Sequence, residues 1–321
     1  MENHFIAWWN LENLFNQESD PTRSEWLQNQ LKRELKGWTT EVLNIKLSQL
    51  AAVIQLMNEG SGPDILGVCE VENKAVLEKL LTALAPLGRS YGIAHDDTED
   101  KRGVDVAFVY DKDKFTAAEQ FTRRIIKRNA TRDIFQVNFK TAMGKDLILV
   151  GNHWPARIPA VFETEPYRII AAETLSYWLK RITEIKGNDV CVIAMGDFND
   201  EPFSRSMTDY ALSSSSKQKV VNSRSSPRLY NLIAAEIVRG VGSYYYSGPY
   251  LFDQLLVSRG LIKSTSPLKV KDGSASVENL NIMAKGRYKA PRRFGRPSKS
   301  SSYDSEGYSD HFPVSVVLEE K

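Results

Sequence analysis

Residues 190–200 read VCVIAMGDFND, an apolar run that ends in a short segment of carboxylate and amide side chains. The run from Val190 to Met195 predicts a buried strand, and Gly196 permits a tight exit from it. Asp197 and Asn199 stand two residues apart, so both side chains lie on the same side of an extended chain. A carboxylate and a neutral amide in this arrangement can hold an attacking water and a phosphate oxygen together. The alternative is an ordinary turn, in which Asp and Asn are common.

Five further segments of this kind are scattered along the chain, each at the end of an apolar run. They are WNL at residues 9–11, CEVEN at 69–73, GNHW at 151–154, LFDQ at 251–254 and YSDH at 308–311. Carboxylates, amides and imidazoles at strand ends are the groups from which a sheet scaffold assembles a metal site. The pattern therefore indicates metal-assisted hydrolysis of phosphoesters.

The oxygen-bearing side chains among these segments are candidate metal ligands. Glu70 ends a buried strand, where an isolated charge is costly unless it is paired or bound to a metal. Asn10 ends the first strand in the same way, and Asp310 stands beside a histidine. Hard oxygen ligands of this kind suit Mg²⁺ or Mn²⁺, whereas a zinc site would need more His or Cys at ligand spacing.

The chain has four histidines, and two of them, His153 and His311, fall at strand ends. Asp253 lies between Phe252 and an apolar run, so its carboxylate is expected to need a partner. His311 is the natural candidate, because a carboxylate fixes the orientation of an imidazole and raises its basicity. The other two histidines, at positions 4 and 95, lack such a setting and are interpreted as structural or solvated.

Length and composition bound the class of protein. A chain of 321 residues with 42% hydrophobic content can bury one large core or two medium ones. Its 42 basic and 40 acidic residues leave a net charge of +2. There is no run of 18 apolar residues and no visible signal peptide, so no membrane partner is expected. Cys69 and Cys191 stand in strand-like runs and are interpreted as buried thiols, which favours a cytoplasmic location.

Alternating strand and helix patterns predict one α/β domain over residues 1–321. Strands are expected at residues 4–9, 64–69, 104–110, 134–139, 147–152, 190–195, 254–258 and 314–318, and helices at 41–57, 74–87 and about 165–185. Three of these strands follow one another without a helix, so the sheet need not be purely parallel. Residues 213–227 are polar and serine-rich and are expected to form an exposed loop.

Taken together, these segments resemble the endonuclease/exonuclease/phosphatase superfamily, which has the DNase I-like fold. The matching elements follow the family's order and comprise residues 9–13, 70–73, 102–107, 152–157, 196–199, 252–253 and 309–311. Residues 12–15 and 153–157 are most similar to the bacterial nuclease-like branch. The resemblance implies a four-layer α/β sandwich, in which two mixed sheets pack face to face with helices outside.

The resemblance also implies roles for the candidate residues. Glu70 would bind the divalent metal, with Asn10 and Asp310 near it. Water would be activated by Asp197, or by His311 paired with Asp253, and these two possibilities stay open. The phosphoryl oxygens would be held, as charge builds in the transition state, by Asn199 and His153.

Residues 285–299 carry seven basic side chains, two aromatic ones and no acid. Proline and glycine predict a loop, which lies shortly before the last acidic segment. A basic loop with interleaved aromatics suits a polyanionic chain whose bases can stack, although such runs are also found as solvated loops without a dedicated ligand. The side chains expected to contact substrate phosphates are Arg102, Arg157, Arg292 and Arg293.

Two other features bear on the substrate. Residues 123–128 form a second basic stretch, which supports a polyanionic substrate only if it lies near the site. Tyr244, Tyr245 and Tyr246 precede Asp253 and could supply a stacking wall. Alternating aromatic residues in a strand belong more often to the core or to a sheet surface.

We therefore expect a Mg²⁺- or Mn²⁺-dependent phosphodiesterase that cuts DNA or RNA by in-line attack of water. One alternative in the same fold is a phosphatase or phosphodiesterase for inositol phosphates, lipids or nucleotides. A more remote alternative is a nucleic-acid-binding module with an inactive site, which is disfavoured because no candidate residue has been lost. A protein partner cannot be inferred from these residues.

Overall fold

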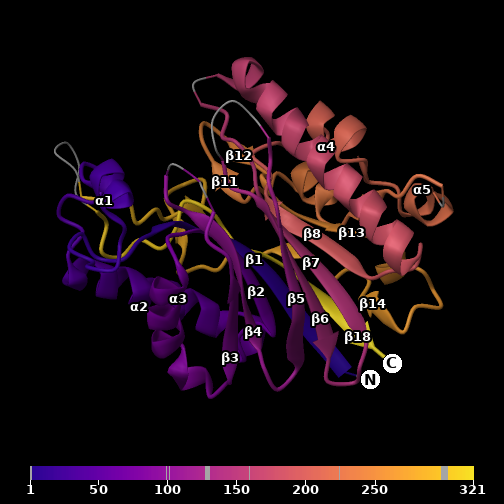
Figure 1. Cartoon of the computed structure of the whole chain (residues 1–321), viewed down its shortest axis with the longest axis horizontal. Helices are drawn as coiled ribbons and strands as arrows, with labels where there is room; N and C mark the ends of the chain where they lie inside the picture. The colour runs from indigo at the N-terminus through magenta and orange to yellow at the C-terminus, as the bar shows by residue number, and fades with distance from the viewer. Residues whose placement is uncertain are drawn as a thin grey trace.

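The computed structural model describes residues 2–98, 100, 102–126, 131–158, 160–223, 225–297 and 303–321. Within these residues, most strands belong to two large sheets that pack face to face, with helices on both outer sides (Figure 1). This is the four-layer α/β sandwich that the resemblance implied. Both sheets contribute side chains to the same apolar cluster. One domain over residues 1–321 stays a prediction.

The first sheet has the strand order β14-β18-β1-β2-β4-β3, and β15 pairs with β18. Its strands are β1 (Glu2–Leu14), β2 (Ile65–Val71), β3 (Tyr91–His95), β4 (Asp105–Asp111), β14 (Leu268–Val270), β15 (Ser276–Val277) and β18 (Val314–Glu320). The pair β1–β2 is parallel, whereas β1–β18 and β2–β4 are antiparallel. The sheet is therefore mixed.

The second sheet has the order β5-β6-β7-β8-β13-β10-β9. Its strands are β5 (Phe115–Arg123), β6 (Ile134–Thr141), β7 (Asp146–His153), β8 (Val192–Asp197), β9 (Ser213–Ser214), β10 (Leu229–Asn231) and β13 (Asp253–Val257). The central strand β8 is buried over its whole length. It has helices on one face and the other sheet on the other, which explains why its sequence is a continuous apolar run.

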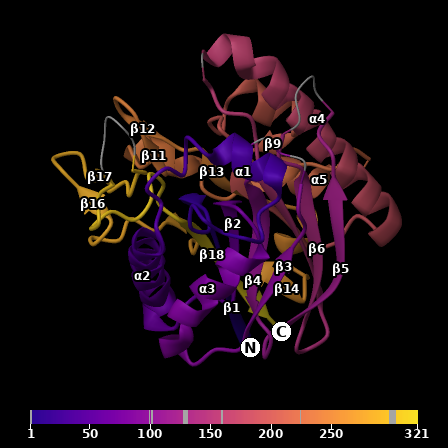
Figure 2. The ribbon, with the colours of Figure 1, turned by 60° about the vertical axis from the view of Figure 1, so that its left-hand side comes forward.

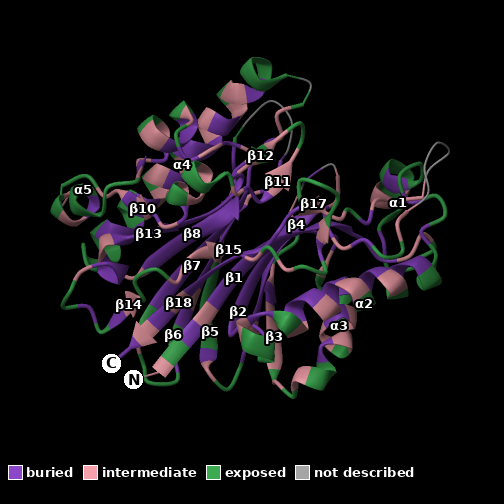
Figure 3. Ribbon diagram, turned by 180° about the vertical axis from the view of Figure 1, so that it is seen from behind, coloured by how far each residue is buried: buried purple, intermediate pink, exposed green. Residues whose placement is uncertain are grey.

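Helices cover the outer face of each sheet, and their exposed sides stand out against the buried strands (Figure 3). Helices α2 (Thr40–Leu56) and α3 (Lys74–Ala83) lie over the first sheet, and α4 (Val161–Lys186) lies over the second (Figure 1). Helices α1 (Glu25–Leu31) and α5 (Lys217–Asn222) lie toward opposite ends of the molecule in Figure 1, and short helical turns lie at 58–60, 85–87, 206–210, 234–239 and 259–261. Helix α2 begins where the Thr39 side chain accepts a hydrogen bond from the Val42 N–H. No helix among the described residues is long and apolar enough to cross a membrane.

Two small hairpins lie next to each other at one end of the sandwich (Figure 2). They pair β11 (Tyr244–Tyr245) with β12 (Pro249–Tyr250), and β16 (Ala284–Lys285) with β17 (Ala290–Pro291). The second hairpin lies in the basic stretch at residues 285–299, so the prediction of a loop there was wrong in part. Lys299 of that stretch and Lys127 and Arg128 of the other lie outside the described residues.

The prediction of an exposed loop over residues 213–227 was also wrong in part. Residues 213–214 form β9, and α5 follows them. The serine residues that suggested a loop include a helix cap, because the Ser216 hydroxyl accepts from the Lys219 N–H. Val220 is buried on the inner side of this helix. Cys69 is buried as predicted, but Cys191 is only partly buried.

Candidate active site

The candidate residues meet at one end of the sandwich, where strands of both sheets end or begin. In the second sheet, Asp197 of β8 is paired with His153 of β7 and with Asp253 of β13. Residues that pair directly across neighbouring strands point to the same face of a sheet. The three side chains therefore form one row. Asp197, Asp253 and His311 each bring one potential ligand atom to within 4.8 Å of the others.

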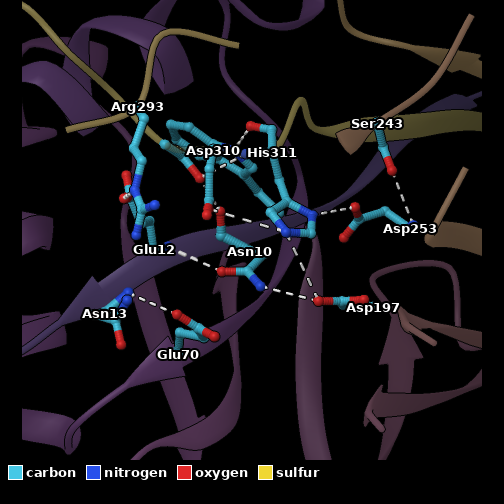
Figure 4. Close-up of polar contacts among 12 residues, drawn as sticks. Asn10, Glu12, Asn13, Glu70, Asp197, Ser243, Asp253, Arg293, Asp310 and His311 are labelled. Atoms are coloured by element: carbon cyan, nitrogen blue, oxygen red, sulfur yellow. Dashed lines mark hydrogen bonds and ion pairs between the residues drawn. The ribbon is translucent and has the colours of Figure 1, made fainter. Parts of the chain in front are cut away.

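His311 and Asp253 form a buried pair (Figure 4). His311 Nδ1 lies 2.6 Å from Asp253 Oδ2, and the other carboxylate oxygen accepts from Trp8 Nε1 at 3.1 Å. The Asp253 N–H donates to Ser243 Oγ at 3.0 Å. Burial alone would lower the pKa of His311, but the carboxylates of Asp253 and Asp197 outweigh it and raise the pKa well above its usual value. The carboxylate thus fixes the imidazole and leaves Nε2 facing the site.

Asp197 lies between the two imidazoles. Its Oδ2 atom is 3.8 Å from His153 Nε2 and 3.9 Å from His311 Nε2, and it accepts from Asn10 Nδ2 at 3.1 Å. Its Oδ1 atom accepts from the Asn199 N–H at 2.9 Å. Burial raises the pKa of Asp197 to about 6. The carboxylate is thus held by two amide donors beside two groups that can contact a phosphate.

Hydrogen bonds hold the loop that follows β8 in place. Asn199 has a φ of 49°, a left-handed conformation that Asn tolerates better than most residues. Its side-chain amide donates to the Trp154 carbonyl oxygen at 3.1 Å. Arg157 donates to the Asn199 carbonyl oxygen at 2.8 Å and to Asp200 at 3.0 Å. In this structure Arg157 therefore positions the Asp197–Asn199 loop.

Glu70 is the residue before the last of β2, has a φ of 60° and lies against His153 of the second sheet. Its carboxylate accepts from the Asn13 N–H at 2.9 Å, and it lies 3.2 Å from Arg102 Nη2 and 3.7 Å from His153 Nε2. Burial would raise the pKa of Glu70, but Arg102 and Arg132 outweigh it and lower the pKa. The same two cations act after burial to lower the pKa of His153 well below its usual value.

The donor set suits a hard divalent cation. Burial raises the pKa of Asp310, and the negative charge of Glu70 adds to this effect, so a cation between the two carboxylates would relieve their repulsion. Carboxylate oxygens are the ligands that Mg²⁺ and Mn²⁺ prefer. Asn10 fits less directly, because its side-chain oxygen Oδ1 accepts from the Glu12 N–H at 2.9 Å. A metal bound to that oxygen would share it with the backbone.

All four arginines expected at substrate phosphates are engaged with carboxylates. Arg102 is paired with Glu70 and Arg157 with Asp200, while Arg292 is paired with Asp304 and Glu306, and Arg293 with Glu12. Arg102 is thereby brought to the metal-ligand candidate Glu70, and the charge of Arg293 acts on Asp310. The role of these arginines as phosphate contacts stays a prediction. Arg123 of the second basic stretch lies 3.6 Å from the centroid of Trp178 on α4.

The family follows from the whole length of the chain. A family model described as Endonuclease/Exonuclease/phosphatase family matches residues 5–320. The chain belongs to this family. Its members act on phosphate esters, so the chain is placed among the phosphoesterases. No curated protein matched the sequence.

Solved structures of this endonuclease/exonuclease/phosphatase fold share little sequence with the chain. A humanized TDP2 of D. rerio carrying 14 mutations is 12% identical with a TM-score of 0.59, and the match covers 99% of each chain. The human nocturnin catalytic domain with bound sulfate is 15% identical with a TM-score of 0.52, covering 99% of this chain and 95% of that one. A mannosyl-6-phosphatase of Bacteroides thetaiotaomicron is 18% identical with a TM-score of 0.57, covering 98% and 99%.

Several residues of this family member's site were not found from its sequence. Ser309 lies in the last acidic segment, where the sequence predicted no role for it; its hydroxyl donates to the Asn10 backbone carbonyl oxygen at 2.6 Å and accepts from the His311 N–H at 3.1 Å. Arg132 donates to the Trp154 carbonyl oxygen at 3.0 Å. No sequence pattern around Ser309 or Arg132 indicates a role in the site. Lys46, by contrast, interrupts the apolar stripe of α2, which is a detectable signal.

Lys46 belongs to a buried network behind Asp310. Its ammonium group donates to the Tyr308 carbonyl oxygen at 2.6 Å and lies 3.9 Å from Glu12. Glu12 in turn accepts from Arg293 and from the Phe294 N–H at 2.9 Å. This network joins β1, α2 and the basic stretch to the turn that carries Asp310 and His311.

Proposed function

We propose that the protein is a divalent-metal-dependent phosphodiesterase, and specifically a nuclease that hydrolyses DNA or RNA by in-line attack of water. The observation that carries this proposal is the position of Asp197 Oδ2, 3.8 Å from one imidazole Nε2 and 3.9 Å from the other. A carboxylate that can act as a base and two imidazoles that can contact a phosphate therefore lie next to one another. Family membership supports a phosphate ester as the substrate.

Glu70 and Asp310 would hold Mg²⁺ or Mn²⁺, with Asn10 beside them. When bound, the cation would neutralise charge on the scissile phosphate and on the leaving oxygen. His153 Nε2 and the Asn199 side chain are the groups proposed to contact the phosphoryl oxygens. One N–H of the Asn199 side-chain amide donates to the Trp154 carbonyl oxygen, so its second N–H is the donor left for a phosphoryl oxygen.

Two groups can accept the proton of the attacking water, Asp197 Oδ2 and His311 Nε2. The raised pKa of His311 favours a proton on Nε2, so His311 acts as a base only after that proton has left, when Nδ1–H still donates to Asp253 and Nε2 presents a lone pair. The variants Asp197→Asn and Asp253→Asn separate these acceptors. The base is identified by the variant that loses more turnover at saturating metal and substrate.

A small phosphate ester is the second candidate substrate. One observation favours it: Lys285, Arg292, Arg293 and Arg296 of the basic stretch already have carboxylate partners. Fewer cations are therefore free for a polymer than the sequence suggests. The similar structure of a mannosyl-6-phosphatase agrees with this alternative.

The deciding experiment incubates the protein with labelled single- and double-stranded DNA and RNA in Mg²⁺, Mn²⁺ or EDTA. Asp197→Ala and His311→Ala are tested beside it, with Asp272→Ala as an exposed carboxylate control. We expect metal-dependent cutting that the first two substitutions abolish and the control retains. Cutting that survives both would come from a contaminant and would count against the proposal. Hydrolysis of inositol phosphates or nucleotides, without cutting of any polymer, would select the alternative.

A further inference from the structure

Two hairpins flank the segment that carries Asp310 and His311. Tyr244 of β11 forms an isolated bridge with His311, and the Phe312 N–H donates to the Ser243 carbonyl oxygen at 2.7 Å. On the other side, the Tyr308 N–H donates to the carbonyl oxygen of Arg292, which follows β17, at 2.7 Å. Strands β11 and β17 also contact each other (Figure 2). The hairpins β11–β12 and β16–β17 therefore form one surface beside the site.

A row of aromatic rings begins at His311 and runs along the first hairpin. The centroids of Tyr244 and His311 are 4.9 Å apart, and Tyr244 is stacked on Phe252 at 5.3 Å. Tyr250 follows at 5.2 Å from Phe252, and the Arg157 guanidinium lies 4.7 Å from the Phe252 centroid. Phe252 is buried, but Tyr244 and Tyr250 are only partly buried. Part of their surface is thus open to a ligand beside the site.

Each hairpin also presents a highly exposed tyrosine at its turn. Tyr246 is 72% exposed and Tyr288 is 78% exposed, so neither ring contributes much to the core. Arg287 and Lys289 flank Tyr288 and are exposed. Among the described residues, neither cation has a carboxylate partner, unlike the other described basic side chains of this stretch. Free aromatic faces and free cations therefore occur together.

We propose that these two hairpins bind single-stranded nucleic acid and lead it into the site. Bases stack on Tyr246, Tyr288 and the open part of Tyr244, while backbone phosphates meet Arg287 and Lys289. This inference rests on the proposed nuclease function and adds the strandedness of its substrate. Aromatic platforms combined with cations are the means by which proteins bind single strands, because a duplex has already stacked the faces of its bases on one another.

An anionic membrane is the other occupant that exposed aromatics and cations would suit. The row of aromatic rings favours a single nucleic-acid strand over a membrane. A membrane surface needs only exposed tips, whereas here the contacting rings of Tyr250, Phe252 and Tyr244 also lead to His311. Rings in contact beside the site are expected where bases next to the scissile phosphate must stack.

The first test measures binding without cleavage. Fluorescence anisotropy of labelled oligothymidylate in EDTA compares the wild type with Tyr246→Ser/Tyr288→Ser and with Arg287→Ser/Lys289→Asn. Asparagine is chosen at 289 because the backbone there has a φ of 47°. The matched control is Tyr177→Ser/Lys219→Ser, which changes an exposed tyrosine on α4 and an exposed lysine on α5.

We expect the tyrosine variant to bind at least about tenfold more weakly, since losing a stacked base costs about that much. The cation variant is expected to weaken binding and to flatten its salt dependence. The control should match the wild type, and duplex DNA should bind more weakly than the single strand. Equal affinity of the tyrosine variant and the wild type, or equal affinity for duplex and single strand, would overturn the proposal. So would co-sedimentation with phosphatidylserine/phosphatidylcholine vesicles in the absence of oligonucleotide binding.

The second test keeps this inference apart from the proposed function. The same variants are assayed with Mg²⁺ on bis(p-nitrophenyl) phosphate and on a single-stranded oligonucleotide. We expect unchanged turnover of the small ester and a raised KM for the oligonucleotide. Tight binding of the strand without cleavage of any polymer would overturn the nuclease proposal and leave the binding surface standing. Cleavage with the same KM in the wild type and the tyrosine variant would overturn the binding surface and leave the nuclease proposal standing.

Discussion

Asp253 is the residue on which the position of His311 depends. It is completely buried, and each of its oxygens has one aromatic or heteroaromatic N–H partner, Trp8 on one side and His311 on the other. An asparagine in its place keeps the shape but removes the charge that orients the imidazole and stabilises its protonated form. The effect should therefore appear in turnover more than in folding.

We accordingly predict that Asp253→Asn lowers kcat on a small phosphodiester by about 100-fold or more, by analogy with other His–carboxylate pairs. The melting temperature should change little. Steady-state kinetics and a thermal melt measure the two quantities, and Asp272→Asn serves as the control. A variant with wild-type kcat would show that the pair has no catalytic role.

Lys46 stabilises the site from α2 by satisfying groups that water cannot reach. Its side chain is fully buried, and its ammonium group lies between the Tyr308 carbonyl oxygen and Glu12. We predict that Lys46→Met lowers the free energy of unfolding by about 3 kcal/mol, because it leaves a buried carboxylate with fewer cations and a carbonyl without its donor. Urea denaturation provides the measurement. Lys36→Met, at an exposed position, should cost little, and an equal loss in both variants would contradict this account.

At the scale of single elements, the β16–β17 hairpin is joined to the following segment by Asp304. This carboxylate accepts from Arg292 Nε at 2.9 Å and Nη2 at 3.0 Å, and these hydrogen bonds lower its pKa to about 2. A carboxyl group with a depressed pKa stabilises the folded state above its unfolded value of about 4. That contribution is lost as the pH falls toward 2.

The melting temperature of Asp304→Asn should therefore lie below that of the wild type at pH 6 and approach it between pH 4 and about 2. The difference is expected to be small, because the pair is partly exposed and solvent screens it. Thermal melts across this range provide the measurement. A difference that stays constant with pH would mean that the charge of Asp304 is not what holds the segment.

The strands also show which structural features sequence patterns can predict and which they cannot. The ends of β2, β7 and β8 were predictable to within two residues, because each apolar run stops at polar residues that burial cannot tolerate without partners, although all three strands continue through these residues. The irregularity of β1 was not. It continues to Leu14, but its register on β2 shifts after Asn10, and Glu12 and Asn13 have positive φ values. Such a bulge depends on the carboxylates and backbone donors around it, which no local periodicity encodes.

At the scale of the whole molecule, the site is assembled across the two sheets. Asn10 and Glu70 come from the first sheet, whereas His153, Asp197 and Asp253 come from the second. The sequence could predict which residues end strands, and family resemblance could predict that they meet. It could not predict that Arg102 pairs with Glu70, or that most basic side chains of residues 285–299 bind carboxylates. Those partners are distant in sequence and are chosen by packing.

This assembly places several carboxylates at the junction between the sheets, and a bound cation would relieve their repulsion. A ligand that binds only the folded state stabilises it by mass action, by about 2.7 kcal/mol at 100 times its dissociation constant. We therefore predict that saturating Mg²⁺ raises the melting temperature by several degrees relative to EDTA. Glu70→Gln should abolish the shift because it removes a charged ligand, and Asp272→Asn should retain it. A shift of equal size in Glu70→Gln would locate the cation elsewhere. No shift in the wild type would mean that the metal binds only together with the phosphate, since substrate oxygens would then complete a coordination sphere that the protein leaves open.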